Sequence, residues 1–446
     1  MSNLNASSNS EPSTKKKSPL GAILLTVFLD LVGFSIIFPL FPDMLEHYLS
    51  QEGADGGMMT TFIQSLEGLS GFEGKEARFA ATVLFGGVLG SLYALLQFVF
   101  APIWGGLSDR RGRRRILLIT VSGTALSYAL WFVAAPFLLL VLSRFVGGIM
   151  AGNLSVATAA VADSTTEENR AKGMGLLGAA FGVGFIIGPA LGALSSLVDL
   201  TGALSFIPGI NPFSGPALFS LLLALINVFW VWRAFPETLS HGSQEKAQHA
   251  KRPMNPLVLF KPTEFKGVNQ TNLLYFIFIA AFSGMEFTLT FLAKDRFDYS
   301  AAKQAYIFLF IGFIIAFVQG GLVRKLAPKY GEKNLTLWGI ALIIPGLVLV
   351  GLAQSEGMMY GGLFALAFGS ALANPSMVSL VSLYAPSERQ GEILGMFRSY
   401  GSLARAFAPI AFAFLYWRFG SAWPYFASAG ILVVPILLAW RLPKRE

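Results

Sequence analysis

The stretch GGLSDRRGRRR, residues 105–115, places five arginines and one aspartate beside strongly apolar sequence. Such a basic run is compatible with a nucleic-acid patch, a localisation signal or a solvated loop. The surrounding chain decides between them, because apolar segments of about 20 residues, each long enough to span a bilayer, precede and follow the run. The run is therefore predicted to be a short cytoplasmic loop between two membrane-spanning helices.

The composition points to the same class of protein. Of the 446 residues, 54% are hydrophobic and 13% are charged, whereas a soluble domain carries about 25% charged residues. Lys and Arg number 33 against 25 Asp and Glu. In a membrane protein this excess belongs to cytoplasmic loops, so it gives no argument for nucleic acid as a partner.

The apolar segments predict an all-α polytopic membrane protein with twelve transmembrane helices in two pseudo-symmetric six-helix bundles. The expected spans lie near residues 20–42, 78–104, 116–135, 137–161, 172–196, 215–235, 270–293, 303–323, 335–353, 358–384, 390–415 and 422–440. The expected divisions are a disordered tail (1–19), an N-terminal bundle (20–236), a central loop (237–268), a C-terminal bundle (269–441) and a second tail (442–446).

Basic residues set the expected orientation. With the N-terminus inside, the cytoplasmic segments hold 24 of the Lys and Arg residues and the outer segments hold six. This asymmetry predicts that both ends of the chain are cytoplasmic. The outer loop 43–77 is acidic, and the spacing of its apolar residues leaves two alternatives open, a short amphipathic helix or an irregular loop.

The two halves resemble each other in sequence. GGLSDRRGRRR follows the second span, and GGLVRKLAPKYGEK (320–333) follows the eighth. The fifth and eleventh spans both place a Gly and a Pro fourteen residues apart, Gly175 to Pro189 and Gly395 to Pro409. Paired halves of this kind are typical of transporters whose binding site lies between them, near the bilayer midplane.

Five ionisable residues fall inside expected spans, namely Asp30, Arg144, Glu286, Arg398 and Arg405. A charge in hydrocarbon is costly, so these residues either form structural ion pairs or line a polar pathway. Asp30 and Glu286 are the candidates for carrying protons. The candidate residues of the central cavity are Arg144, Arg398 and Arg405, and Asp30 is the candidate partner of Arg144. Three arginines against two carboxylates favour an anionic or zwitterionic substrate.

Several classes of site are not indicated. His47, His241 and His249 show no metal-ligand spacing, and the chain contains no Cys, so we expect no metal site. No phosphate-binding loop motif, nucleophile–His–acid set or channel filter is present, which argues against an enzyme and a channel. We therefore expect no cofactor other than the proton as coupling ion.

The loop motif resembles that of the major facilitator superfamily, G-x-L-a-D-[RK]-x-G-[RK]-[RK]. The matching residues are Gly105, Leu107, Asp109, Arg110, Gly112, Arg113 and Arg114. The resemblance implies that Asp109 meets the N-terminal end of the eleventh span and forms a conformational latch. Such a contact is favourable because a helix N-terminus attracts a carboxylate. The predicted latch residues are Gly105, Asp109, Arg110, Gly112 and Arg113.

Other motifs extend the resemblance. Arg144-Phe-Val-Gly-Gly148 is similar to the family's fourth-helix motif, with Gly147 in place of its Gln. Gly184, Gly188, Pro189 and Gly192 resemble the fifth-helix motif typical of antiporters, although Ala193 replaces its last Gly. Asp30, Gly33 and Pro39 resemble the first helix of tetracycline/H⁺ antiporters. The stretches 283–300 and 391–417 resemble the tetracycline-transporter-like proteins of animals, a group associated with efflux of organic anions.

These observations predict a proton-coupled antiporter that exports amphiphilic organic molecules by alternating access. We expect it to act as a monomer in the lipid bilayer of a plasma membrane or a bacterial inner membrane. Two alternatives stay open: a symporter or a lipid or nutrient carrier of the same fold, and a receptor or scaffold that does not transport.

Overall fold

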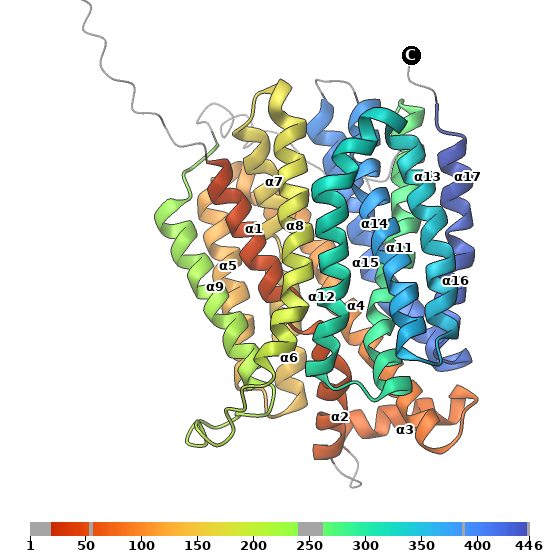
Figure 1. Cartoon of the computed structure of the whole chain (residues 1–446). Helices are drawn as coiled ribbons and strands as arrows, with labels where there is room; N and C mark the ends of the chain where they lie inside the picture. The colour runs from red at the N-terminus through yellow and green to blue at the C-terminus, as the bar shows by residue number, and fades with distance from the viewer. Residues whose placement is uncertain (1–18, 53–56, 240–261, 386–388, 444–446) are drawn as a thin grey trace, which may run out of the picture.

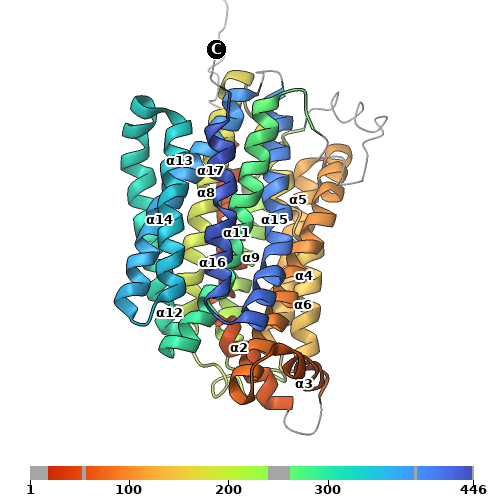
Figure 2. The ribbon, with the colours of Figure 1, turned by 90° about the vertical axis from the view of Figure 1, so that its right-hand side faces the viewer.

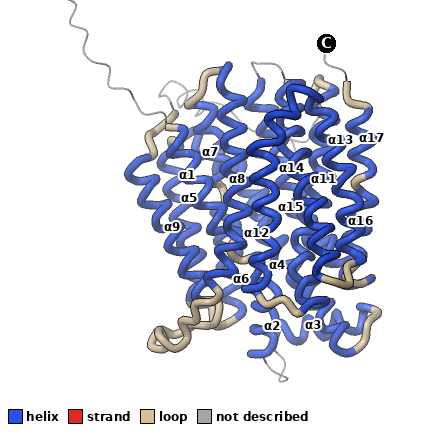
Figure 3. Tube along the Cα trace, viewed as in Figure 1, coloured by secondary structure: helices blue, strands red, loops and turns tan. Residues whose placement is uncertain are grey.

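The computed structural model describes residues 19–52, 57–239, 262–385 and 389–443, and this part of the chain is built from helices joined by loops (Figure 3). Residues 1–18 of the predicted disordered tail (1–19), 240–261 of the predicted central loop (237–268) and 444–446 of the second tail (442–446) lie outside the described residues. Two sets of helices form the two sides of one bundle (Figure 1).

The N-terminal set comprises α1 (Leu20–Ser35), η1 (Phe38–Leu40), α2 (Phe41–Glu52), α3 (Met58–Ser70), α4 (Gly74–Arg111), α5 (Arg113–Phe132), α6 (Phe137–Met150), α7 (Asn153–Asp163), α8 (Glu167–Ser195) and α9 (Ser214–Ala234). The C-terminal set comprises α11 (Lys266–Phe297), α12 (Ala301–Phe317), η3 (Val318–Leu322), α13 (Val323–Leu352), α14 (Glu356–Tyr384), α15 (Gln390–Phe419), α16 (Trp423–Ile431) and α17 (Val433–Trp440). The start of α1 and the end of α17 lie at one end of the bundle, which we call the terminal end (Figure 1). The helix α3 lies at the opposite end, which we call the α3 end.

Eleven helical segments of the described chain are long and apolar enough to cross a membrane. The helix α15 is not among them, since it carries Arg398 and Arg405, yet it packs along α4 and α11 within the bundle. The expected number of twelve spans, the cytoplasmic location of both ends and the domain limits therefore stay predictions.

The most extensive contacts between the halves are made by two helix pairs, α4 with α15 and α8 with α12. Figure 2, which is turned by 90° from Figure 1, also shows α15 beside α4. The sequence repeats equate the second span with the eighth and the fifth with the eleventh. The pair α4–α15 joins the second span to the eleventh, and the pair α8–α12 joins the fifth span to the eighth. Exchanging the two halves therefore turns one helix pair into the other. The packing thus agrees with two repeats related by a pseudo-two-fold axis.

Both basic junctions turn at a glycine with positive φ. Gly112 separates α4 from α5 with φ 96°, and Gly331 interrupts α13 with φ 77°. Only glycine adopts this backbone region without strain. At Gly112 an added Cβ would also lie 2.5 Å from the Glu237 carboxylate, which accepts hydrogen bonds from the first amides of α5, Arg113 N at 2.9 Å and Arg114 N at 3.2 Å.

The acidic segment 43–77 is largely helical, so of the two alternatives the amphipathic helix is the correct one. Residues 43–52 continue the first span as α2, and α3 lies across the α3 end of the bundle (Figure 1). Ile63 faces the protein, whereas Leu69 is 66% exposed. Two residues of α15 hold α3 to the other half: Trp417 donates to Leu66 O at 3.2 Å, and Arg418 donates to Ser70 O at 3.0 Å.

Candidate functional site

A cavity lies between the two halves, and both contribute to it. Its walls come from α1, η1, the start of α2, α4, α7 and α8 on one side and from α11 and α15 on the other. It encloses about 1010 Å³ of space not filled by atoms, including the part open to solvent. A cavity lined by both repeats is suited to a ligand that contacts both halves.

Three of the five predicted intramembrane charges meet in this cavity: Asp30 from α1, Glu286 from α11 and Arg405 from α15. The Arg405 guanidinium lies over the Phe181 ring, 5.2 Å from its centre, and attracts the Glu286 carboxylate electrostatically. The cavity therefore offers two acidic groups and one basic group to a ligand.

The expected partner of Asp30 differs from the one found. Asn153, the first residue of α7, donates a hydrogen bond from Nδ2 to Asp30 Oδ1 at 2.7 Å. The described ion pairs include none between Asp30 and Arg144. The suggested Asp30–Arg144 pair is thus wrong for this structure, because Arg144 faces a different set of side chains.

Arg144 is 4% exposed and packs against aromatic rings of α5. Its guanidinium lies 5.0 Å from the centre of the Trp131 ring and 6.0 Å from that of Tyr128. It is not among the residues that line the cavity. Ring faces attract a buried cation, so these contacts offset part of the cost of burying Arg144, and its role in transport stays a prediction.

Arg398 is not among the residues that line the cavity. It donates from Nη2 to Met174 O of α8 at 2.9 Å, and it therefore links the two halves. Although Arg398 and Arg405 lie on one face of α15, only Arg405 lines the cavity. The predicted excess of positive charge thus holds for the bundle as a whole, while in the cavity the carboxylates outnumber the guanidinium.

Aromatic side chains make much of the remaining wall. Phe34 stacks on Tyr93 with ring centres 4.7 Å apart, and Phe41 meets Phe287 edge to face at 6.1 Å across the two halves. The other aromatic lining residues are Phe38 and Phe181, and the uncharged polar ones are Gln97, Ser283, Thr290 and Ser402. An amphiphile with an apolar body and a charged group matches this lining.

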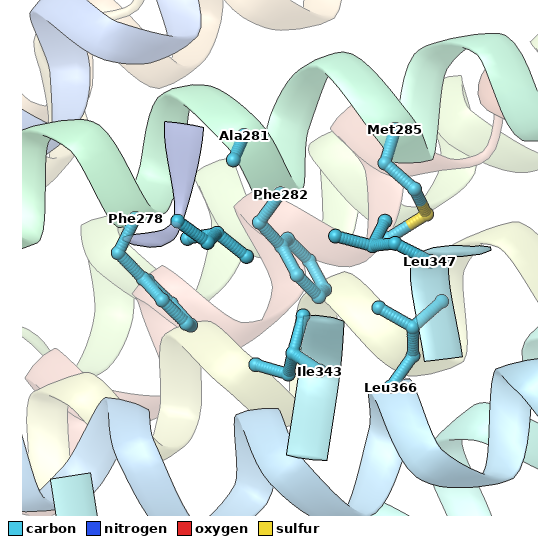
Figure 4. Close-up of a pocket in the computed structure, with 8 residues that line it drawn as sticks. Phe278, Ala281, Phe282, Met285, Ile343, Leu347 and Leu366 are labelled. Carbon is cyan, nitrogen blue, oxygen red and sulfur yellow. The ribbon is translucent and has the colours of Figure 1, made fainter. Parts of the chain in front are cut away.

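A second cavity has a different character. It lies inside the C-terminal half, and Figure 4 shows Phe278, Phe282, Met285, Ile343, Leu347 and Leu366 around it. All of its lining side chains are apolar, and no charged group reaches it. It offers nothing to orient a charged ligand, so the cavity between the halves is the candidate substrate site.

The predicted latch residues gather at the terminal end. Asp109 pairs with Arg113 at 2.5 Å, and Arg113 also binds Asp163 at 2.9 Å. Gly105 lies where an added Cβ would meet Ser155 Oγ at 2.7 Å. Arg110 and Gly112 end α4 beside this cluster. The first side chains of α15, at 390–392, lie outside the described ones, so the Asp109 latch stays a prediction.

The predicted antiporter-like motif forms the contact between α8 and α1. An added Cβ would lie 3.0 Å from Phe28 O at Gly184, 2.6 Å from Val32 O at Gly188 and 2.0 Å from Ile36 O at Gly192. Pro189 sits within α8 beside Gly188. The glycines let the two helix backbones approach closely, and the link of this motif to antiport stays a prediction.

Two residues near Asp30 were not predicted from the sequence: Asn153, which bonds to Asp30, and Gln97, which lines the cavity with it. Both are uncharged polar residues within expected spans. Such residues, like charged ones, mark polar pathways through membrane proteins, so they could have been selected from the sequence. The described residues contain no group of three or more His, Asp or Glu side chains placed to hold a metal ion.

Comparison with known proteins agrees with this architecture. The model of the Major Facilitator Superfamily matches residues 23–409 and, in a second match, residues 326–446. Major facilitator superfamily domain-containing protein 10 of Mus musculus is 32% identical over 437 residues, which cover 94% of this chain and 92% of that protein. The class G tetracycline resistance protein of Vibrio anguillarum is 30% identical over 405 residues, covering 90% and 91%.

Solved structures support the same assignment. The crystal structure of the human organic anion transporter MFSD10 (TETRAN) matches with a TM-score of 0.75 and 30% identity, covering 96% of this chain and all of that one. A bacterial homolog of the human lysosomal transporter Spinster, at 14% identity and a TM-score of 0.64, shares the fold. The chain is therefore an integral membrane transporter, not an enzyme, and it belongs to the major facilitator superfamily.

Proposed function

We propose that the chain exports amphiphilic organic molecules that carry both an anionic and a cationic group, in exchange for protons and by alternating access. The observation that carries this proposal is the cavity between the halves, where Asp30, Glu286 and Arg405 stand among aromatic side chains. A site built from both halves becomes accessible from either side when the halves rock against each other.

The lining supports the substrate class. Arg405 offers a guanidinium to a carboxylate, sulfonate or phosphate of the substrate, and such charge-assisted hydrogen bonds are among the strongest available. The rings of Phe34, Phe38 and Phe287 offer an apolar surface to the rest of the molecule. The similarity to a protein described as an organic anion transporter supports the same class.

Exchange with protons requires that substrate and proton compete. A zwitterion satisfies this condition, because its cationic group binds the carboxylates of Asp30 and Glu286 while its anionic group binds Arg405. Protonation removes the negative charge that holds the cationic group. Proton uptake from one side then drives release of the substrate on that side.

Cotransport of an anion with protons is the second candidate, and the attraction between Glu286 and Arg405 favours it. A purely anionic substrate must compete with the Glu286 carboxylate for the guanidinium. Protonation of Glu286 frees Arg405, so proton and anion bind together. The charge of the substrate therefore decides the direction of coupling.

Proteoliposomes with an imposed pH gradient and a clamped membrane potential test the proposal. We expect tetracycline, as the zwitterionic probe, to move against the proton flux, and Glu286→Gln and Asp30→Asn to abolish this coupling. Glu356→Gln is the matched control, because Glu356 pairs with Lys303 at the α3 end, outside the cavity. Flux of the probe in the proton direction establishes cotransport, and binding without any flux establishes a receptor.

A further inference from the structure

The fourth expected span is broken in the middle. The helix α6 ends at Met150 and α7 begins at Asn153, with Ala151 and Gly152 between them outside both helices. Hydropathy alone predicts one continuous span over 137–161. A break inside a span is tolerated only where other protein groups satisfy the freed backbone atoms.

The helix α4 supplies those groups. Trp104 donates from Nε1 to Ile149 O at 2.6 Å, and Gln97 donates from Nε2 toward Ala151 O at 3.4 Å. At Gly152 an added Cβ would lie 2.5 Å from Trp104 Cβ, so only glycine fits there. The break is therefore a defined feature that is held against α4.

This fixed break determines where Asn153 lies. Its side chain is 1% exposed, and its amide donates to Asp30 Oδ1 at 2.7 Å, with Thr124 Oγ1 at 3.5 Å as a second acceptor. A buried amide is costly unless it is paired, and its N–H group bonds more strongly to a carboxylate than to an uncharged acceptor. The other side chains around Asp30 include Tyr93 and Tyr128, whose hydroxyls interact with it electrostatically.

We propose that Asn153 is a positioning residue for proton exchange at Asp30. The break between α6 and α7 sets the Asn153 amide against the carboxylate and holds Asp30 at the cavity wall, where protons and substrate reach it. The inference rests on the proposed proton coupling for its effect on transport, while the hydrogen bond itself is tested separately below.

A double-mutant comparison in proteoliposomes tests the effect on transport. We expect Asn153→Leu to lower gradient-driven transport about tenfold or more, while substrate exchange without a gradient persists. In the Asp30→Asn background, where gradient-driven transport is already expected to be lost, adding Asn153→Leu should leave substrate exchange without a gradient at the level of Asp30→Asn alone, because Asn153 acts through Asp30.

Asn227→Leu is the matched control. Asn227 is equally buried and also donates to α1, but its acceptor is the backbone oxygen Thr26 O at 3.1 Å. Asn227→Leu should retain gradient-driven transport. An equal loss in Asn227→Leu, retained coupling in Asn153→Leu, or a further loss of gradient-free exchange when Asn153→Leu is added to Asp30→Asn would each overturn the inference.

Infrared spectroscopy of the purified protein separates this inference from the proposed function. The carboxyl bands of Asp30, identified by their loss in Asp30→Asn, should shift in Asn153→Leu and stay in place in Asn227→Leu. Unshifted bands overturn the positioning role whatever the transport result. If Asp30→Asn keeps its coupling but the bands shift, the proton assignment fails and the positioning role stands.

Discussion

Asp43 of α2 and Lys294 of α11 form an ion pair that joins the two halves at the α3 end. Lys294 also contacts Glu46 at 2.5 Å, and the second oxygen of Asp43 accepts a hydrogen bond from Ala301 N, at the start of α12, at 3.0 Å. One aspartate of the first half thus holds two helices of the second. Any state that opens the cavity at this end must separate these residues.

Removal of this contact should favour opening at the α3 end. We expect Asp43→Asn to raise the open population about fivefold, since a partly exposed ion pair contributes about 1 kcal/mol. Spin-label distances between the halves measure the change. Lys303→Gln, which breaks a pair within one half, is the control. The charge swap Asp43→Lys with Lys294→Asp should restore closure. This role is contradicted if Asp43→Asn leaves the distances unchanged and the charge swap does not restore closure.

The close approach of α8 to α1 should make Gly192 intolerant of a side chain. Gly192→Ala is expected to lower the free energy of unfolding by about 1–3 kcal/mol, because the added Cβ meets Ile36 O. Thermal unfolding in detergent measures the loss. Gly182→Ala lies on the same helix with open space around the added Cβ, so it should show none. Equal stability of the two variants would exclude this packing.

Arg405 should bind the anionic group of the substrate. We expect Arg405→Gln to raise the Kd of a sulfonated aromatic probe about 10–100-fold, the size of one lost hydrogen bond between charged groups. Arg398→Gln is the comparison on the same helix face, because Arg398 bonds to Met174 O instead of lining the cavity. Calorimetry on both variants checks this, and equal weakening by both contradicts the assignment.

Arg113 should stabilise the terminal end, because its guanidinium pairs with both Asp109 and Asp163. Arg113→Met removes this shared guanidinium from two partly buried carboxylates, and we expect a loss of about 3 kcal/mol in unfolding free energy. The exposed Arg115→Met serves as control. Adding Asp163→Asn to Arg113→Met should recover part of the loss, and a double variant less stable than the single one argues against this account.

The Asp109 latch has its own test. Asp109→Asn should leave membrane insertion intact and shift the balance between states open at either end, which spin-label distances between the halves report. Unchanged distances together with normal transport would remove the latch.

Much of the architecture follows from local sequence. Apolar runs locate the spans, and the junction glycines Gly112 and Gly331 mark two turns that the backbone then makes. The break at Gly152 escapes a hydropathy argument, because Met150 and Leu154 on either side are as apolar as the rest of the span. The side chains that hydrogen-bond its free carbonyls, Trp104 and Gln97, come from another helix.

The sequence by itself determined that the chain crosses a membrane many times, in two similar halves, with a few costly charges inside. These properties depend on composition and on periodicity along one segment. Only the tertiary structure decided which charges meet. Asp30, Glu286 and Arg405 share a cavity, whereas Arg144 turns to Trp131 and Arg398 to Met174. Those outcomes depend on how each helix is rotated and where it crosses its neighbours, which packing of whole helices sets and local sequence does not.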